Sequence, residues 1–273
     1  MSTGTNVIAP DLSDRSLKEL VSLDGKVAVV TGGGRGLGAA IVRRLSQAGA
    51  AVVVADLDAA SAEGLAADLN GAGARAIAAT VDVSDPASIA ALAETAVTEL
   101  GSLDVWVNNA GIYPVVDFLE TTPEQLDAML AVNVRGTFFG AQAAARAMVA
   151  AGRPGVIVNL GSTASFDAAD NPAHYVASKH AVVGLTKRLA IELGPHGIRA
   201  LAVAPTLTRT PGTDLKREDP AAAAGMDAYA ADLPLGRMGV PDDIARAVLF
   251  AATGLSEYLT GSAIVVDGGA LAG

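Results

Sequence analysis

Residues 26–38, KVAVVTGGGRGLG, decide the fold of this chain. Their apolar start is typical of a buried strand, and the apolar residues from Ala39 to Leu45 that follow them indicate a helix. Glycines allow the backbone to turn tightly and to approach a pyrophosphate, whose negative charge then lies at the partly positive helix N-terminus. The order of strand, glycine turn and helix therefore predicts a dinucleotide-binding loop that includes Gly32, Arg35, Gly36, Leu37 and Gly38.

An acidic residue follows where such a site needs one. The next apolar run, residues 51–55, ends in Asp56, about 18 residues beyond Gly38. A carboxylate there accepts hydrogen bonds from the adenosine ribose hydroxyls and repels a 2′-phosphate. The sequence therefore favours NAD over NADP as the cofactor, and Leu57 is expected to lie beside the adenosine. The charge of Arg35 could reach a phosphate, so strict exclusion of NADP does not follow.

Strand and helix patterns alternate from residue 26 onward, which is typical of an α/β domain with a parallel sheet covered on both faces. We therefore predict a single doubly wound Rossmann-type domain over residues 25–273, preceded by an N-terminal extension at residues 1–24. Residues 207–234 mix charges and prolines, and we interpret them as a lid over the substrate. The predicted strands are residues 27–31, 51–56, 74–81, 105–108, 156–160, 198–204 and 263–266.

The amino-acid composition limits the kinds of ligand and partner that the chain can bind. Its formal net charge of -10 argues against a nucleic-acid partner, which needs clustered basic residues. With no cysteine and three scattered histidines, expected at the surface or at helix ends, no metal site is predicted. The start of the chain has no secretory signal pattern, and no apolar run approaches the ~18 residues that cross a membrane. We therefore expect a cytoplasmic protein with a small-molecule ligand.

A second motif, Tyr175-Val-Ala-Ser-Lys179, carries acid–base chemistry. Tyr175 and Lys179 lie four residues apart on a predicted helix and so project from one face. A phenol loses its proton near pH ~10, and a nearby ammonium is expected to lower that pKa. We therefore predict that Tyr175 exchanges a proton with an alcohol or ketone oxygen while a nicotinamide carries hydride.

With both motifs in view, the chain resembles a short-chain dehydrogenase/reductase from about Gly25 to Gly269. The resemblance implies a catalytic tetrad, with Ser162 bonding the substrate oxygen and Asn133 anchoring a water relay; its members are Asn133, Ser162, Tyr175 and Lys179. It also implies that Lys179 holds the nicotinamide ribose. Further cofactor contacts expected from it are Asp82, Val83, Asn109, Ala110, Gly111, Tyr175, Pro205, Thr208 and Thr210.

One residue departs from the family pattern. Thr206 follows Pro205 where the family commonly has glycine, which makes the contacts from Thr208 and Thr210 less secure. The expected substrate walls are mostly apolar, with Tyr113, Phe166, Met226 and Tyr229 available. These residues predict an NAD-dependent short-chain alcohol dehydrogenase or ketoreductase that acts on a small hydrophobic secondary alcohol or ketone.

Two alternatives stay open at this point. One is a 3-oxoacyl-(acyl-carrier-protein) reductase, although the net negative charge disfavours an acidic carrier protein. The other is a non-catalytic dinucleotide-binding regulator, whose catalytic residues would be damaged. The family resemblance also implies a homotetramer, for which residues 245–252 and 263–266 could supply the interface or could instead be buried in the chain's own core.

Overall fold

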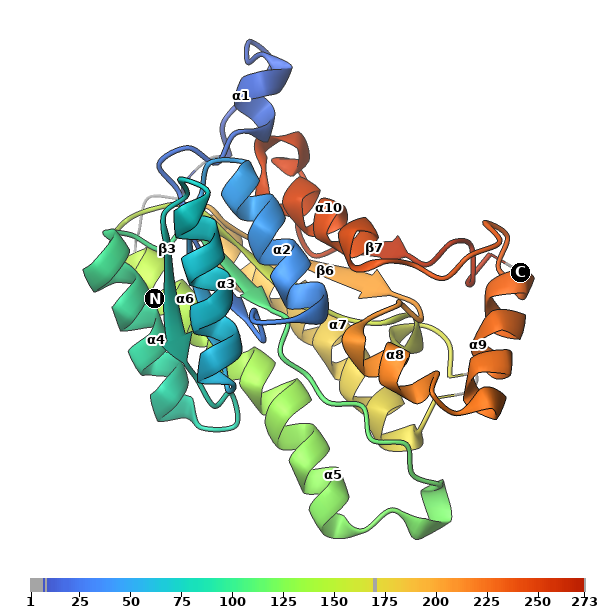
Figure 1. The fold of residues 1–273 in the computed structure, drawn as a ribbon. Coiled ribbons are helices and arrows are strands. Elements are labelled where there is room, and N and C mark those ends of the chain that lie inside the picture. Colours follow the sequence, from blue (N-terminus) through green and yellow to red (C-terminus); the bar gives the residue numbers. More distant parts are fainter. Residues whose placement is uncertain (1–6, 8, 169–170, 273) are drawn as a thin grey trace.

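A seven-stranded parallel sheet forms the centre of the molecule, in the strand order β3-β2-β1-β4-β5-β6-β7 (Figure 1). The computed structural model describes residues 7, 9–168 and 171–272. The sheet order reverses beside β1, which pairs with β2 on one side and β4 on the other, so the predicted doubly wound topology is confirmed. The strands are β1 (Val27–Thr31), β2 (Ala51–Asp56), β3 (Ala76–Thr80), β4 (Val105–Asn108), β5 (Gly155–Leu160), β6 (Ile198–Pro205) and β7 (Ala263–Val266).

Helices cover both faces of this sheet because successive strand side chains point to opposite faces. Ala28 and Val30 of β1 join a core with α2, α3 and α10, whereas Val27 and Val29 join a second core with α4, α6 and the end of α7. The helices are α1 (Leu17–Val21), α2 (Gly36–Gln47), α3 (Ala59–Gly71), α4 (Pro86–Leu100), α5 (Pro123–Met129), α6 (Thr137–Ala150), α7 (Ala173–Leu193), α8 (Pro211–Lys216), α9 (Pro220–Asp232) and α10 (Pro241–Ala252).

Several shorter elements complete the chain. A π-helical segment, η2 (Leu130–Gly136), joins α5 to α6, and four short 3-10 turns are η1 (Phe118–Glu120), η3 (Thr163–Ser165), η4 (Gly194–His196) and η5 (Gly254–Ser256). No helix within the described residues is long and apolar enough to cross a membrane.

The glycine turn between β1 and α2 is the tightest junction of the fold. Gly32 and Gly36 have φ angles of 62° and 56°, in the left-handed region that favours glycine. A Cβ atom on Gly38 would lie 1.9 Å from the Gly32 carbonyl oxygen and 2.7 Å from the Asn109 side-chain nitrogen. Only glycine at position 38 therefore lets α2 start this close to the end of β1.

The two apolar stretches considered for a subunit interface have different surroundings. In α10, Ala245, Val248 and Ala251 are buried in the chain's own core against α2. In contrast, Val265 of the edge strand β7 is 42% exposed. The core therefore accounts for the α10 stretch, and the homotetramer stays a prediction.

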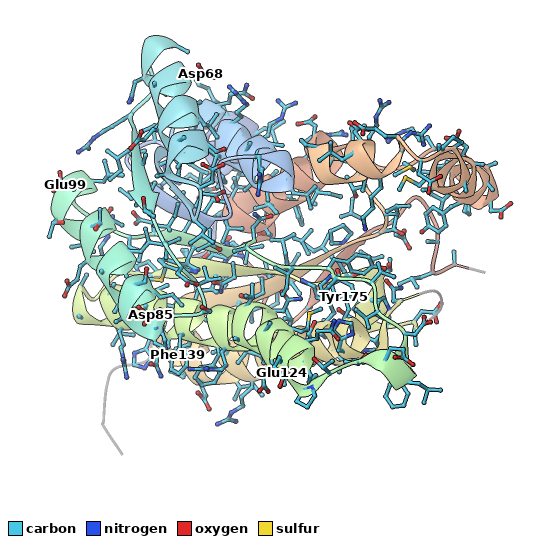
Figure 2. The ribbon with its side chains drawn as sticks, turned by 60° about the horizontal axis from the view of Figure 1, so that its bottom comes forward. Asp68, Asp85, Glu99, Glu124, Phe139 and Tyr175 are labelled. Carbon is cyan, nitrogen blue, oxygen red and sulfur yellow. The ribbon has the colours of Figure 1, made fainter. Side chains whose placement is uncertain are left out.

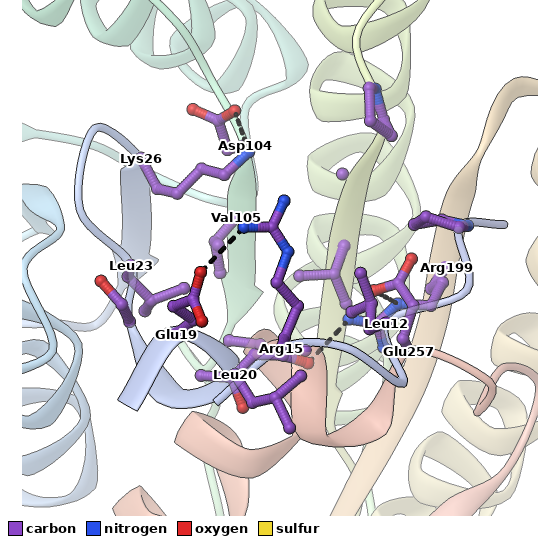
Figure 3. Close-up of a pocket in the computed structure, with 18 of the residues that line it drawn as sticks. Leu12, Arg15, Glu19, Leu20, Leu23, Lys26, Asp104, Val105, Arg199 and Glu257 are labelled. Carbon is purple, nitrogen blue, oxygen red and sulfur yellow. Dashed lines mark hydrogen bonds and ion pairs between the residues drawn. The ribbon is translucent and has the colours of Figure 1, made fainter. Parts of the chain in front are cut away.

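A buried carboxylate joins the N-terminal ends of the central strands. Asp104, which precedes β4, accepts hydrogen bonds from the Val27 amide at 3.0 Å and from the Ser102 hydroxyl at 2.7 Å. Its other oxygen lies 2.9 Å from Arg153 and 3.4 Å from Lys26. Figure 3 shows this Lys26–Asp104 pair beside a cavity of about 400 Å³ under the N-terminal segment. Asp104 thus joins the starts of β1, β4 and β5.

The pKa of Asp104 is set by opposing effects. Burial of the carboxyl raises its pKa, but the hydrogen bonds from Ser102, Val27 and Arg153 and the charge of Lys26 lower it further, so the net shift is downward from 3.8. The folded state therefore binds the ionised form more strongly than the unfolded chain does.

Replacing Asp104 with Asn should lower the free energy of unfolding by about 1–3 kcal/mol near pH 7, because hydrogen bonds to a charged group are lost. The stabilisation by the carboxylate is complete above its unfolded pKa and is lost as the pH falls through its lower folded pKa. Urea unfolding of wild type and Asp104→Asn at neutral and acid pH measures this, and the difference should shrink at acid pH. Asp14→Asn, at an exposed position, is the control. Equal stability of wild type and Asp104→Asn at neutral pH would contradict the role given to Asp104.

Candidate active site

A cleft of about 740 Å³ lies at the C-terminal ends of the central strands, which is where parallel sheets bind ligands. Figure 2 shows Tyr175 on the side of the molecule where the segment after β6 lies, away from Glu99. Predicted site residues that line the cleft are Leu37, Asn109, Gly111, Tyr175, Lys179, Pro205, Thr208 and Thr210. Predicted residues outside its lining are Gly32, Arg35, Gly36, Gly38, Asp56, Leu57, Asp82, Val83, Ala110, Asn133 and Ser162.

Tyr175 and Lys179 lie together on the first turns of α7, as their spacing predicts. The Lys179 ammonium donates a hydrogen bond to the Leu160 carbonyl at 2.8 Å and lies 5.6 Å from the centre of the Tyr175 ring. The Tyr113 ring packs edge-on against the Tyr175 ring, with ring centres 4.5 Å apart. The phenol is thus held between an aromatic wall and a buried cation.

The expectation that Lys179 lowers the pKa of Tyr175 is wrong for this structure. Burial raises the pKa of Tyr175 above 10.0, a hydrogen bond with Ser162 opposes that rise, and Lys179 is not among the causes. Burial also lowers the pKa of Lys179 from 10.5 to about 8. Both shifts have the same origin, because a low-dielectric surrounding disfavours the charged form of each group.

Ser162 bonds to the local backbone as well as to Tyr175. Its hydroxyl accepts a hydrogen bond from the Ala164 amide at 3.1 Å and so caps the turn η3. The same side chain forms the hydrogen bond that lowers the pKa of Tyr175. A capping role and a position beside the phenol are therefore combined in one residue.

Asn133 is buried in the π-helical segment η2, a kind of helix that is frequent at functional sites. Its amide oxygen accepts from the Ile112 amide at 2.9 Å, and its nitrogen donates to the Ile112 carbonyl at 3.1 Å. The nitrogen also lies 3.3 Å from the Ser178 hydroxyl on α7. Asn133 therefore joins the loop after β4 to the helix that carries Tyr175.

A buried polar chain beneath the cleft fixes α7 against the sheet. The Trp106 indole donates to Asn108 at 2.7 Å, Asn108 donates to Asn159 at 2.8 Å, and Asn159 donates to Thr186 of α7 at 2.9 Å. In a nonpolar interior each of these groups requires its partner. This series of hydrogen bonds therefore sets the distance between α7 and strands β4 and β5.

Hydrogen bonds from the loop after β4 hold the glycine turn in place, at the position where the sequence predicts the phosphates of a dinucleotide. The Asn109 side chain donates to the carbonyls of Thr31 and Gly32 at 2.8 and 2.9 Å, while the Thr31 hydroxyl accepts from the Asn109 and Ala110 amides at 3.1 Å each. A Cβ on Gly36 would meet no atom closer than 3.8 Å, which leaves open space at the start of α2. The turn is thus rigid and its helix end is accessible.

Asp56 lies beside this turn, as its sequence position predicts. Its carboxylate accepts hydrogen bonds from the Gly34 amide at 2.9 Å and from the Asp58 amide at 3.0 Å. Arg35 and Leu57 are exposed next to it. Asp82 is also exposed and accepts from Ser84.

The region around Thr206 explains the departure from the family pattern. The Thr206 hydroxyl is hydrogen-bonded to the Tyr229 hydroxyl of α9, and the Thr206 carbonyl accepts from the Thr208 hydroxyl at 2.9 Å. Thr210 caps α8 by accepting from the Thr213 amide. Threonine at position 206 therefore supplies a hydroxyl that glycine lacks, and both Thr208 and Thr210 remain in the cleft lining.

All three histidines lie at the surface or near a helix end, as expected, but one of them is buried. His180 and His196 are exposed, but His174 is only 4% exposed, at the start of α7. Neither ring nitrogen of His174 has a hydrogen-bond partner within the part of the chain that the structure describes. The start of α7 is covered by neighbouring elements, so a helix-end position did not make this residue a surface residue.

Some residues that shape the site were missed by sequence reasoning. Thr31 holds the loop after β4, and the Ser165 hydroxyl donates to the Lys179 carbonyl at 2.8 Å. Asn159 and Thr186 complete the buried polar chain. Asn159, a polar residue inside an apolar strand, is the sequence signal that could have indicated these buried hydrogen bonds, since a buried amide needs partners.

Comparisons with known proteins show the family of the chain. A family model described as Enoyl-(Acyl carrier protein) reductase matches residues 32–270. The chain is 39% identical over 250 residues to the 3alpha-hydroxysteroid dehydrogenase of Mediterraneibacter gnavus, covering 91% of this chain and 98% of that protein. It is 38% identical over 250 residues to the L-xylulose reductase of Bos taurus, covering 92% and 98%.

A solved structure gives the same result for the fold. The crystal structure of a gluconate 5-dehydrogenase from Burkholderia cenocepacia, in complex with NADP and tartrate, has a TM-score of 0.88 and 34% identity, covering 94% of this chain and 100% of that chain. The chain is therefore a member of the short-chain dehydrogenase/reductase family of oxidoreductases, as its motifs predict.

Proposed function

We propose that this oxidoreductase interconverts a secondary alcohol and a ketone, with Tyr175 as the residue that gives or takes the proton. The observation that carries this proposal is the position of the Tyr175 phenol in the cleft lining, hydrogen-bonded with Ser162 and beside the buried Lys179. The names of relatives such as L-xylulose reductase support the same substrate class. A nicotinamide dinucleotide, when bound, supplies the hydride acceptor or donor.

Each residue of the tetrad has a distinct part in the proposed reaction. In ketone reduction the Tyr175 hydroxyl gives its proton to the carbonyl oxygen, and in alcohol oxidation its oxygen takes the hydroxyl proton. The Ser162 hydroxyl donates a hydrogen bond to the same substrate oxygen, where charge develops. Burial raises the pKa of Tyr175 and so favours the protonated phenol, the form needed for reduction.

Lys179 and Asn133 act behind the phenol in this proposal. Lys179 is held by the Leu160 carbonyl, and its ammonium would hold the ribose hydroxyls of the cofactor. Asn133 is a positioning residue, because its amide group fixes the backbone of Ile112 in the cleft wall. Its bonds to that backbone are observed, whereas the water relay stays a proposal.

The two alternatives are less well supported. A 3-oxoacyl thioester reductase would have to attract an acidic carrier protein to a chain with a net charge of -10. A non-catalytic regulator has no need for Tyr175 and Lys179 in the lining of one cleft, with Ser162 beside the phenol. The alcohol dehydrogenase or ketoreductase activity therefore accounts for the site best.

Replacing Tyr175 with Phe should lower kcat by at least about 100-fold, because general acid–base catalysis contributes roughly that factor or more. The dissociation constant of NADH, measured by fluorescence titration, should change little, since the ring and its contact with Tyr113 are retained. Tyr258→Phe, at a side chain that is 97% exposed, is the matched control and should keep full activity. Retained turnover in Tyr175→Phe would exclude the proposed mechanism.

For the cofactor we propose NAD rather than NADP. The Asp56 carboxylate is buried and fixed by the amides of Gly34 and Asp58, so its charge cannot move away from a 2′-phosphate. The exposed guanidinium of Arg35 lies close enough to influence Asp58 and weakens this discrimination. A structural relative is in complex with NADP, so the proposal separates this chain from that relative.

Replacing Asp56 with Asn keeps the shape of the side chain and removes its charge. We expect wild type to bind NADH at least about tenfold more tightly than NADPH, a difference of ~1.4 kcal/mol, and Asp56→Asn to lose most of that ratio. Fluorescence titration with both cofactors measures it independently of the substrate. Arg35→Ala should instead widen the ratio. Equal affinities of wild type for the two cofactors would reject the NAD preference.

We further propose that residues 207–234 form a lid over the substrate. The segment folds as α8 and α9, which have no fully buried residue, and Met226 and Tyr229 of α9 line the cleft beside Thr206. The hydrogen bond between Thr206 and Tyr229 connects α9 to the end of β6. That bond would hold the lid at a fixed distance from Tyr175.

Removing either hydroxyl of this pair should weaken the docking of the lid. We expect Tyr229→Phe and Thr206→Val each to raise KM by roughly fivefold, the effect of about 1 kcal/mol, with kcat nearly unchanged. The double variant should be no worse than either single variant, because both lose the same interaction. Steady-state kinetics of all three variants measure this coupling. Additive effects on KM would show that the two hydroxyls act separately.

A further inference from the structure

The cations of the lid differ in whether they have an acidic partner. Arg209 pairs with Asp214 at 2.9 Å, and Arg217 pairs with Asp227 at 2.8 Å. Lys216, between them in sequence, has no carboxylate within ion-pair distance among the residues that the structure describes. Its ammonium is therefore available to an external anion, whereas the two guanidinium groups are neutralised locally.

Lys216 lies outside the cleft lining but contacts a residue of the cleft wall. It lies three residues after Thr213 on α8, so the two side chains share one helix face, and Thr213 lines the cleft. The Lys216 ammonium lies 5.3 Å from the centre of the Tyr113 ring. Tyr113 lines the cleft too, and its ring contacts Tyr175 edge-on at 4.5 Å. One aromatic ring thus separates the ammonium from the proposed proton donor.

The contact with Tyr113 holds the Lys216 side chain in place before an anionic ligand binds. A cation over an aromatic face is attracted by the ring and keeps its full charge. Holding the flexible side chain in advance also reduces the entropy lost when a ligand binds. A carboxylate is the group that such an ammonium binds by charge-assisted hydrogen bonds.

We propose that Lys216 is a specificity-determining residue that binds a carboxylate of the substrate, so that the substrate class is an oxo-acid or the corresponding hydroxy acid. This inference rests on the proposed function and amends the neutral apolar substrate predicted from the sequence.

The test compares oxo-acids with their neutral methyl esters. A homologous series from 4-oxopentanoate to 7-oxooctanoate varies the distance between ketone and carboxylate, and each ester removes only the charge. Wild type, Lys216→Met, Lys216→Arg and Lys18→Met are assayed for kcat/KM with NADH, and binding of the acids is measured by calorimetry. Lys18, exposed on α1 far from α8 in Figure 1, is the control for loss of one positive charge.

We expect wild type to favour at least one acid over its ester, and Lys216→Met to lower kcat/KM for that acid by roughly 10-fold or more, as loss of a charged hydrogen bond does. The esters should change by less than about twofold, while Lys216→Arg and Lys18→Met should keep the preference. Acids and esters used equally well by wild type, or an acid preference that survives in Lys216→Met, would overturn the inference and leave the proposed function standing. If neither the acids nor the esters are turned over, but the acids bind in a way that depends on Lys216, the proposed function alone would be overturned. If there is neither turnover nor Lys216-dependent binding, the inference and the proposed function would both be overturned.

Discussion

Two hydrogen bonds from the Asn109 side chain, to the carbonyls of Thr31 and Gly32, hold the end of β4 against the glycine turn. The rest of the site depends on this contact, because it fixes the cofactor loop relative to the strand that leads to Tyr113. It is possible only because position 38 has no Cβ, which would lie 2.7 Å from the Asn109 nitrogen. The absent side chain of Gly38 and the polar side chain of Asn109 thus meet at the junction between β1, α2 and the loop after β4.

Desolvation has the largest effect on the proposed catalytic pair. It raises the pKa of Tyr175 and lowers that of Lys179 to about 8, so burial favours the neutral form of both groups. The Lys179 ammonium is held in place by its hydrogen bond to the Leu160 carbonyl. Proton donation from Tyr175 therefore requires no prior ionisation, whereas proton acceptance requires the phenolate. The buried chain from Trp106 to Thr186 stabilises this arrangement by fixing α7 on the sheet.

Much of the fold could be predicted because its signals are local. Four of the seven strands have the predicted bounds. The others differ at their ends: β3 spans Ala76–Thr80 rather than residues 74–81, and β5 and β6 each gain one residue. The Tyr175–Lys179 pair is also local, since helical spacing alone brings the two onto one face. The helices within residues 207–234 could not be predicted in the same way. Neither α8 nor α9 has a fully buried residue, so the sequence there has no periodic apolar pattern that would indicate a helix.

The sequence by itself determined the parallel α/β architecture, the glycine turn with Asp56, and the Tyr175–Lys179 pair, because periodicity and short motifs depend on a few neighbouring residues. Asn133 and Ser162 were identified through the family resemblance. Only the tertiary structure decided the direction of the pKa shift of Tyr175, the burial of His174, and the contacts of Thr206 with Tyr229 and of Lys216 with Tyr113. Those properties depend on solvent exclusion and on distances between segments that are remote in sequence, which no local pattern encodes.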